Sequence, residues 1–185
     1  MCHYLFRLLV LAVTVAVNEN FRLKTTQAYR ASILHFPNKS TCPKQDYEYF
    51  EDGLLITRNE KIEFVGEYKN HINQYPDAIT QDYSGKLLLP GFIDSHLHFP
   101  QTEMLASFGE QLLDWLTDYT FPVERKFADA EYASHIAKIF IRQLHRHGTT
   151  TGMVYSSVHK QAADALFQEA ASHKMLLIAG KVCMD

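Results

Sequence analysis

The 185-residue sequence contains few cysteines and no large excess of charge of either sign. Its three cysteines, Cys2, Cys42 and Cys183, are too scattered for a disulfide framework and lack zinc-finger spacing, which favours a reducing compartment. The formal net charge is −3, so no broad basic surface is indicated and nucleic acid is not expected as a partner. The H-x-E … P-C-x-x-C signature of one class of zinc deaminases is also absent, which excludes that fold.

Long hydrophobic runs are absent as well. Leu8–Val17 is apolar except for Thr14 and follows a single basic residue, Arg7, but ten residues are too few to span a bilayer as a helix. No membrane partner is therefore expected. Met1–Val17 resembles a secretory signal with a poor cleavage site; a buried β-strand and an alternative start unrelated to the fold are the other interpretations. We expect a cytoplasmic protein, or a secreted one if this leader acts as a signal peptide.

Short strands and turns are predicted for the next part of the chain. Gly53–Thr57 and Lys61–Gly66 flank the turn Arg58–Glu60 and predict a hairpin. Asp82–Lys86 is a polar segment that predicts a break between elements. We interpret this region as part of a small β-domain that presents the strand following it.

The stretch Leu87–Gln101, LLLPGFIDSHLHFPQ, contains the strongest chemical signal in the sequence. Side chains alternate faces along a strand, so His96 and His98 are predicted to point the same way and Leu97 the opposite way. Two imidazoles side by side on one face can bind a divalent metal such as zinc. By the same parity Asp94 is expected on their face, where it could orient a ligand histidine or bond to the backbone instead.

This stretch resembles the first barrel strand of the amidohydrolase superfamily, in which a His-x-His pair opens the metal site. LLDWLTDYTFPVERKF (112–127), HGTTTGMVY (147–155) and AGKVCMD (179–185) narrow the resemblance to the guanine deaminases, from about Ala28 onwards. The resemblance implies a zinc-dependent hydrolase of purine catabolism that converts guanine to xanthine and ammonia, with one Zn²⁺ per subunit and a homodimeric full-length form. It also implies that the residues from His98 to Gln101, which include Phe99 and Pro100, contact the purine. The Gln101 amide offers the donors and the acceptor that the edge of guanine requires.

Alternating helices and strands are predicted after this site. Asp129–His147 reads as an amphipathic helix with Asp129 as N-cap and Gly148 as C-cap. Thr149–Tyr155 and Met175–Ile178 read as strands around a helix at Val158–His173, which is an α/β pattern with parallel crossovers. Phe99–Phe127 is expected to be a long loop with short helical pieces. Lys181 is interpreted as structural.

The fold class expected from pattern and resemblance is α/β: the N-terminal part of a (β/α)8 TIM-like barrel preceded by part of a small β-sandwich domain. The expected divisions are an apolar leader at 1–27, the β-domain segment at 28–86 and an incomplete hydrolase barrel at 87–185. A complete barrel takes about 250 residues, so 99 residues (185 − 86) are expected to be the beginning of a longer one. The resemblance places the later metal ligands and the proton-shuttling glutamate beyond these residues, so no catalytic residue is assigned and the chain alone is expected to be inactive. Another amidohydrolase acting on a different heterocycle and a truncated non-catalytic product are the alternatives.

Overall fold

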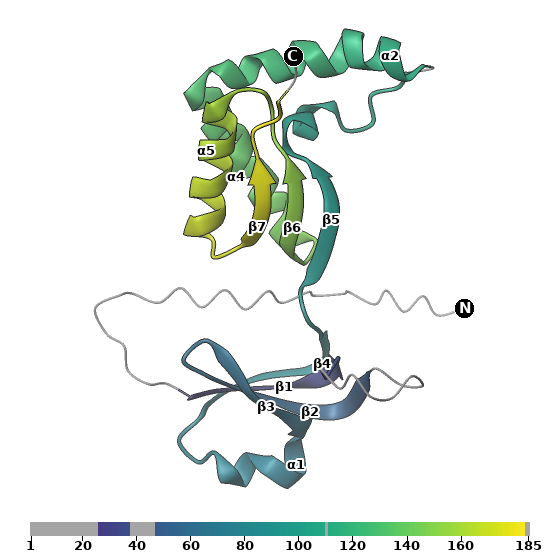
Figure 1. Cartoon of the computed structure of the whole chain (residues 1–185). Helices are drawn as coiled ribbons and strands as arrows, with labels where there is room; N and C mark the ends of the chain where they lie inside the picture. The colour runs from purple at the N-terminus through teal and green to yellow at the C-terminus, as the bar shows by residue number, and fades with distance from the viewer. Residues whose placement is uncertain (1–25, 38–46, 110, 184–185) are drawn as a thin grey trace. The chain divides into compact units, whose positions relative to one another are not determined.

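The computed structural model describes residues 26–37, 47–109 and 111–183, and the chain divides into two compact units between Pro90 and Gly91 (Figure 1). The leader Met1–Val17 lies outside the described residues. Within the described part of the chain, no helix has both the length and the apolar character needed to cross a membrane.

The first unit is a four-stranded sheet with the order β3-β2-β1-β4, in which β1 and β4 are parallel and the other neighbours are antiparallel. Apolar side chains cover both faces: Tyr29 and Ile33 belong to one buried cluster, and Leu54 and Ile56 belong to the other. The elements are β1 (Thr26–His35), β2 (Glu48–Arg58), β3 (Lys61–Glu67), α1 (Tyr68–His71), the 3-10 turn η1 (Ile72–Gln74) and β4 (Ile79–Leu88).

The predicted hairpin is confirmed as β2 and β3. Its turn residues Asn59 and Glu60 have φ of 52° and 64°, and positive φ at both positions is what a two-residue type I′ turn requires. The break predicted at Asp82–Lys86 is wrong, because these residues lie inside β4. The segment is instead an irregularity within that edge strand: the pairing with β1 changes register there and Gly85 has φ of 78°. Its polar side chains are compatible with a strand because most of them are exposed.

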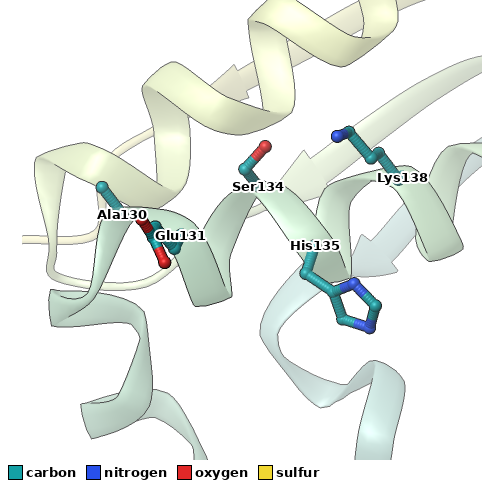
Figure 2. Close-up of a pocket in the computed structure, with 5 residues that line it drawn as sticks. All are labelled: Ala130, Glu131, Ser134, His135 and Lys138. Atoms are coloured by element: carbon teal, nitrogen blue, oxygen red, sulfur yellow. The ribbon is translucent and has the colours of Figure 1, made fainter.

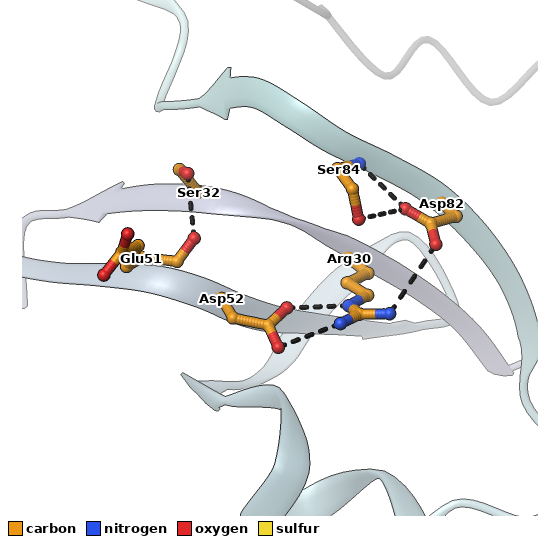
Figure 3. Close-up of polar contacts among 6 residues, drawn as sticks. All are labelled: Arg30, Ser32, Glu51, Asp52, Asp82 and Ser84. Atoms are coloured by element: carbon orange, nitrogen blue, oxygen red, sulfur yellow. Dashed lines mark hydrogen bonds and ion pairs between the residues drawn. The ribbon is translucent and has the colours of Figure 1, made fainter.

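One ion-pair network links three strands of this sheet (Figure 3). The Arg30 guanidinium on β1 donates to both carboxylate oxygens of Asp52 on β2, at 2.7 and 3.0 Å. It also lies 3.7 Å from Asp82 on β4 and 4.3 Å from the ring centroid of Tyr68. The hydrogen bond from Arg30 lowers the pKa of the Asp52 carboxyl. Every charge in this network has a partner, so we assign it a structural role.

The second unit confirms the predicted α/β pattern. Three parallel strands have the order β5-β6-β7, and α4 and α5 lie on one face of the sheet (Figure 1). Phe99, Ile136, Ile141, Val154 and Leu166 are among the buried side chains of the core between helices and sheet. The elements are β5 (Phe92–His98), η2 (Phe99–Met104), α2 (Leu112–Trp115), the π-helical turn η3 (Leu116–Thr120), α3 (Phe121–Arg125), η4 (Lys126–Ala128), α4 (Ala130–Arg146), β6 (Thr149–Tyr155), α5 (Lys160–Ser172) and β7 (Leu176–Gly180).

Both predicted ends of α4 are confirmed. The Asp129 side chain accepts from the backbone N–H groups of Glu131 and Tyr132 at 2.8 and 3.3 Å, as an N-cap does. Gly148 follows the last helical turn with φ of 83°, a conformation that favours glycine.

The start of the helix after β6 differs from prediction. The helix expected from Val158 begins at Lys160, because the hydroxyl of Ser157 accepts from the backbone of His159 and holds a turn there. The segment 99–127 contains the short helical pieces that were expected within a long loop, and from Leu112 onwards they follow one another without a gap. Local hydrogen bonds stabilise this segment, such as that from the Trp115 indole to the carbonyl of Ser107 at 3.3 Å.

Candidate metal centre

The imidazoles of His96 and His98 converge at the carboxyl end of β5. Their Nε2 atoms lie 3.2 Å apart, and their ring centroids are separated by 5.0 Å. Two nitrogens bound to one tetrahedral zinc at 2.0–2.1 Å lie about 3.3–3.4 Å from each other. The spacing of the two nitrogens therefore fits a shared metal ion with little movement of either ring.

The start of β5 is held close to β6 by a glycine. A Cβ at Gly91 would lie 2.2 Å from the hydroxyl oxygen of Thr150, so a larger residue would push the strands apart. Immediately after it, the N–H of Phe92 donates to the carbonyl of Gly148 at 2.8 Å. The Pro-Gly step therefore sets the position from which the histidine strand begins.

The register of β5 corrects the expectation that Asp94 shares the face of the two histidines. Asp94 pairs with Gly152 and Leu97 pairs with Val154, so β5 advances three residues while β6 advances two. This irregularity interrupts the alternation of faces between Asp94 and His96. The Asp94 carboxylate accepts from the backbone N–H of His96 at 3.0 Å. It thus acts on the backbone of the histidine pair, which was the second of the two interpretations of this residue.

Gln101 lies beside His98, with its amide nitrogen 3.3 Å from Nδ1 of that ring. A histidine that binds a metal through Nε2 carries its proton on Nδ1, so the amide oxygen of Gln101 would then be the acceptor of this bond. Burial, followed by the charge of His96, lowers the pKa of His98 and favours the neutral ring that a metal ligand requires.

Phe99 and Pro100 are both buried, in contrast to the exposed His96. The Phe99 ring packs against Phe127 and Phe140, with centroid distances of 5.0 and 5.5 Å, on the helical side of the sheet. Phe99 can therefore contact a substrate only through its backbone atoms.

Tyr155 is a residue of this site that sequence reasoning missed. It pairs in register with His98 across β5 and β6, and its ring stacks on that imidazole with a centroid distance of 5.0 Å and an interplanar angle of 16°. Its ring centroid is 5.5 Å from that of His96. The available signal was its position at the carboxyl end of the neighbouring parallel strand, where sites of such sheets are built.

Within the described residues, no group of three or more histidine, cysteine, aspartate or glutamate side chains could hold a metal ion. The pair supplies two nitrogen ligands of the at least three protein ligands usual in a catalytic zinc site. Lys181 follows β7, and its ammonium donates to the carbonyl of Val182 at 3.0 Å.

A separate surface depression lies on α4 and is lined by Ala130, Glu131, Ser134, His135 and Lys138 (Figure 2). Its side chains diverge: those of Ser134 and Lys138 point to one side of the helix and that of His135 to the other. This arrangement does not converge on a ligand, unlike the histidine pair.

Comparison with known proteins relates the chain to one enzyme family. The sequence profile of the Amidohydrolase family matches residues 87–185. Guanine deaminase from Escherichia coli K12 is 46% identical over 165 residues, which cover 87% of this chain and 38% of the relative. The chain thus spans well under half the length of this relative.

Solved structures agree with the sequence comparison. Guanine deaminase from E. coli superposes with a TM-score of 0.80 at 45% identity, covering 86% of this chain and 38% of that structure. The enzyme from C. acetobutylicum, solved with guanine bound in its active site, gives 0.72 at 26% identity, with coverages of 87% and 37%. An atrazine chlorohydrolase from Arthrobacter aurescens TC1 complexed with zinc gives 0.65 at 18% identity, covering 83% and 35%, and this likeness concerns the fold alone.

Proposed function

The chain belongs to the Amidohydrolase family, and we propose that it supplies the His96–His98 metal pair and part of the purine pocket of a guanine deaminase. The reaction is the hydrolysis of guanine to xanthine and ammonia. The observation that carries the proposal is the convergence of the two Nε2 atoms, 3.2 Å apart, at the carboxyl end of a parallel strand. The choice of guanine is supported by the 46% identity to the E. coli enzyme.

Zinc is the metal we propose, at one ion per subunit, because two imidazole nitrogens at this spacing suit its tetrahedral geometry. When bound, it would supply a water whose pKa is lowered to about 7, so that hydroxide is available at neutral pH. The chain contributes the two ligands, and Asp94 fixes the backbone at the first of them through its bond to the N–H of His96.

We propose that the side chain of Gln101 contacts guanine. Its amide carries two donors and one acceptor. If the oxygen accepts from Nδ1 of His98, both N–H donors remain available for an acceptor on the purine edge. We also propose backbone contacts from Phe99 and Pro100, a cytoplasmic location and a homodimer for the enzyme that contains this chain. The alternative of another heterocycle as substrate is not favoured, because the zinc-bound chlorohydrolase is only 18% identical.

A complementation experiment tests the proposal. Residues 1–185 are fused to the part of E. coli guanine deaminase that follows its matched region, and xanthine formation and zinc content are measured. We expect zinc-dependent turnover of guanine, and loss of both zinc and turnover in His96→Ala and His98→Ala. His135→Ala, an exposed imidazole on α4, is the matched control and should leave both unchanged. Full turnover in His96→Ala would contradict the proposed metal pair.

A further inference from the structure

The ring of Tyr155 makes a face-to-face contact with one metal-binding candidate and not with the other. Its plane is inclined by 16° to that of His98 and by 59° to that of His96. The contact follows directly from the sheet, because Tyr155 and His98 are register partners on β6 and β5.

We propose that Tyr155 is a positioning residue for His98: its ring fixes the plane of the imidazole so that Nε2 faces Nε2 of His96. The proposal rests on the proposed metal pair. Rotation about χ2 of a histidine is broad, so the direction of Nε2 is not set by the strand alone. A stacked neighbour removes tilted orientations, and the amide of Gln101 near Nδ1 selects between the two remaining flips of the ring.

Tyr155 is not required for the hydrophobic core. Half of its surface is exposed, whereas its neighbour Val154 is 3% exposed and packs in the core beneath the helices. Since successive strand residues face opposite sides, Tyr155 lies on the face that the helices do not cover. A substitution there can therefore change the orientation of His98 without unfolding the unit.

The contact involves the ring of Tyr155 and not its hydroxyl, so removing the hydroxyl and removing the ring should affect zinc binding differently. Tyr155→Phe keeps the stacked ring, and Tyr155→Leu removes it while keeping an apolar side chain. Offset stacking and edge contacts between rings stabilise an arrangement beyond simple burial. We expect wild-type zinc affinity in Tyr155→Phe and an affinity about three- to tenfold weaker in Tyr155→Leu, or about 0.7–1.4 kcal/mol, because 1.4 kcal/mol corresponds to a factor of ten.

The test is zinc binding by the full 185-residue chain, measured by competition with a weak chromophoric chelator. Phe167→Leu is the matched control, because Phe167 is an aromatic residue on α5 that is 43% exposed. Circular dichroism of each variant verifies the fold. In addition, NMR of the metal-free protein should show contacts between the protons of the Tyr155 and His98 rings, which Tyr155→Phe retains at the same strength.

The outcomes separate this inference from the proposed metal pair. Equal zinc affinity of Tyr155→Leu and wild type, with His98→Ala weakened, overturns the role of Tyr155 and leaves the pair intact. Equal weakening by Phe and Leu also overturns it, because the hydroxyl would then be responsible. Failure of both the 185-residue chain and its fusion with the E. coli segment to bind zinc overturns both proposals.

Discussion

Removal of one hydroxyl, in Tyr132→Phe, should produce a stability loss that depends on pH. The Tyr132 hydroxyl on α4 donates to Oε2 of Glu103 at 2.5 Å, and Lys126 lies 3.2 Å from the same oxygen. Glu103 belongs to η2, the turn that also carries Gln101. The contact therefore ties the segment of the proposed purine pocket to the main helix of the second unit.

The expected size follows from the geometry. A hydrogen bond to a charged group contributes about 1.5–3 kcal/mol when it is shielded from water. The Glu103 side chain is 41% exposed, so we reduce the expectation to about 1 kcal/mol for Tyr132→Phe at pH 7. The ring itself is retained, and with it the edge contact to Phe127 at a centroid distance of 5.1 Å.

The sign of the pH dependence follows from the two pKa shifts. The hydrogen bond from Tyr132 lowers the pKa of Glu103, so this contribution is present above the ordinary value of 4.5 and is lost as the pH falls through the lowered value. Burial, followed by the bond to Glu103, raises the pKa of Tyr132, so its contribution is complete below pH 10.0 and is lost as the pH rises beyond it. The effect of the substitution should therefore be largest between these limits.

Urea unfolding of wild type and Tyr132→Phe at pH 7 and pH 3 measures this dependence. We expect a difference of about 1 kcal/mol at pH 7 and less than about 0.5 kcal/mol at pH 3. Tyr119→Phe, a change at a residue that is 42% exposed, is the control and should have little effect at either pH. A difference for Tyr132→Phe that is equal at both pH values would refute the assignment of the bond to an ionised carboxylate.

Three further predictions concern the site and its supporting helix. The 185 residues alone, loaded with zinc, should form no xanthine from guanine, since only two ligands are assigned; turnover abolished by His96→Ala would show that another chain or a dismissed residue completes the site. In the fusion with the E. coli segment, Gln101→Ala should lower guanine turnover much more than zinc content, and an equal loss of both would make Gln101 structural. Asp129→Ala should lower the free energy of unfolding by about 1 kcal/mol in urea titrations because two capped N–H groups lose their acceptor, whereas Asp129→Asn, which keeps the acceptor oxygen, should cost less.

Sequence patterns of short range predicted several helices, strands and turns correctly. The caps of α4, the β2–β3 hairpin and the segments that form β5, β6 and β7 could be predicted because each signal lies in residues close in sequence. The shared face of His96 and His98 follows from a spacing of two, and the convergence of their rings in the structure agrees with it.

The features that were missed depend on partners far away in sequence. Asp94 was misplaced because the irregularity between Asp94 and Leu97 appears only when β5 is paired with β6. Tyr155 lies 57 positions after His98 (155 − 98), so nothing in the local pattern indicates their stacking. The burial of the Phe99 side chain against Phe127 and Phe140 was also missed, because it depends on how η4 and α4 pack.

The short connection between β4 and β5 has a consequence for the order of synthesis. Only Leu89, Pro90 and Gly91 separate the two strands, and every strand of the first sheet precedes them. At about 5–20 residues per second, the first sheet can assemble while the 51 residues from Phe99 to Thr149 (149 − 98) are still being added, which takes about 3–10 seconds. During that interval β5, the strand that carries His96 and His98, has been synthesised without its neighbour β6. The backbone hydrogen-bonding groups of β5 must then be kept from pairing with another strand.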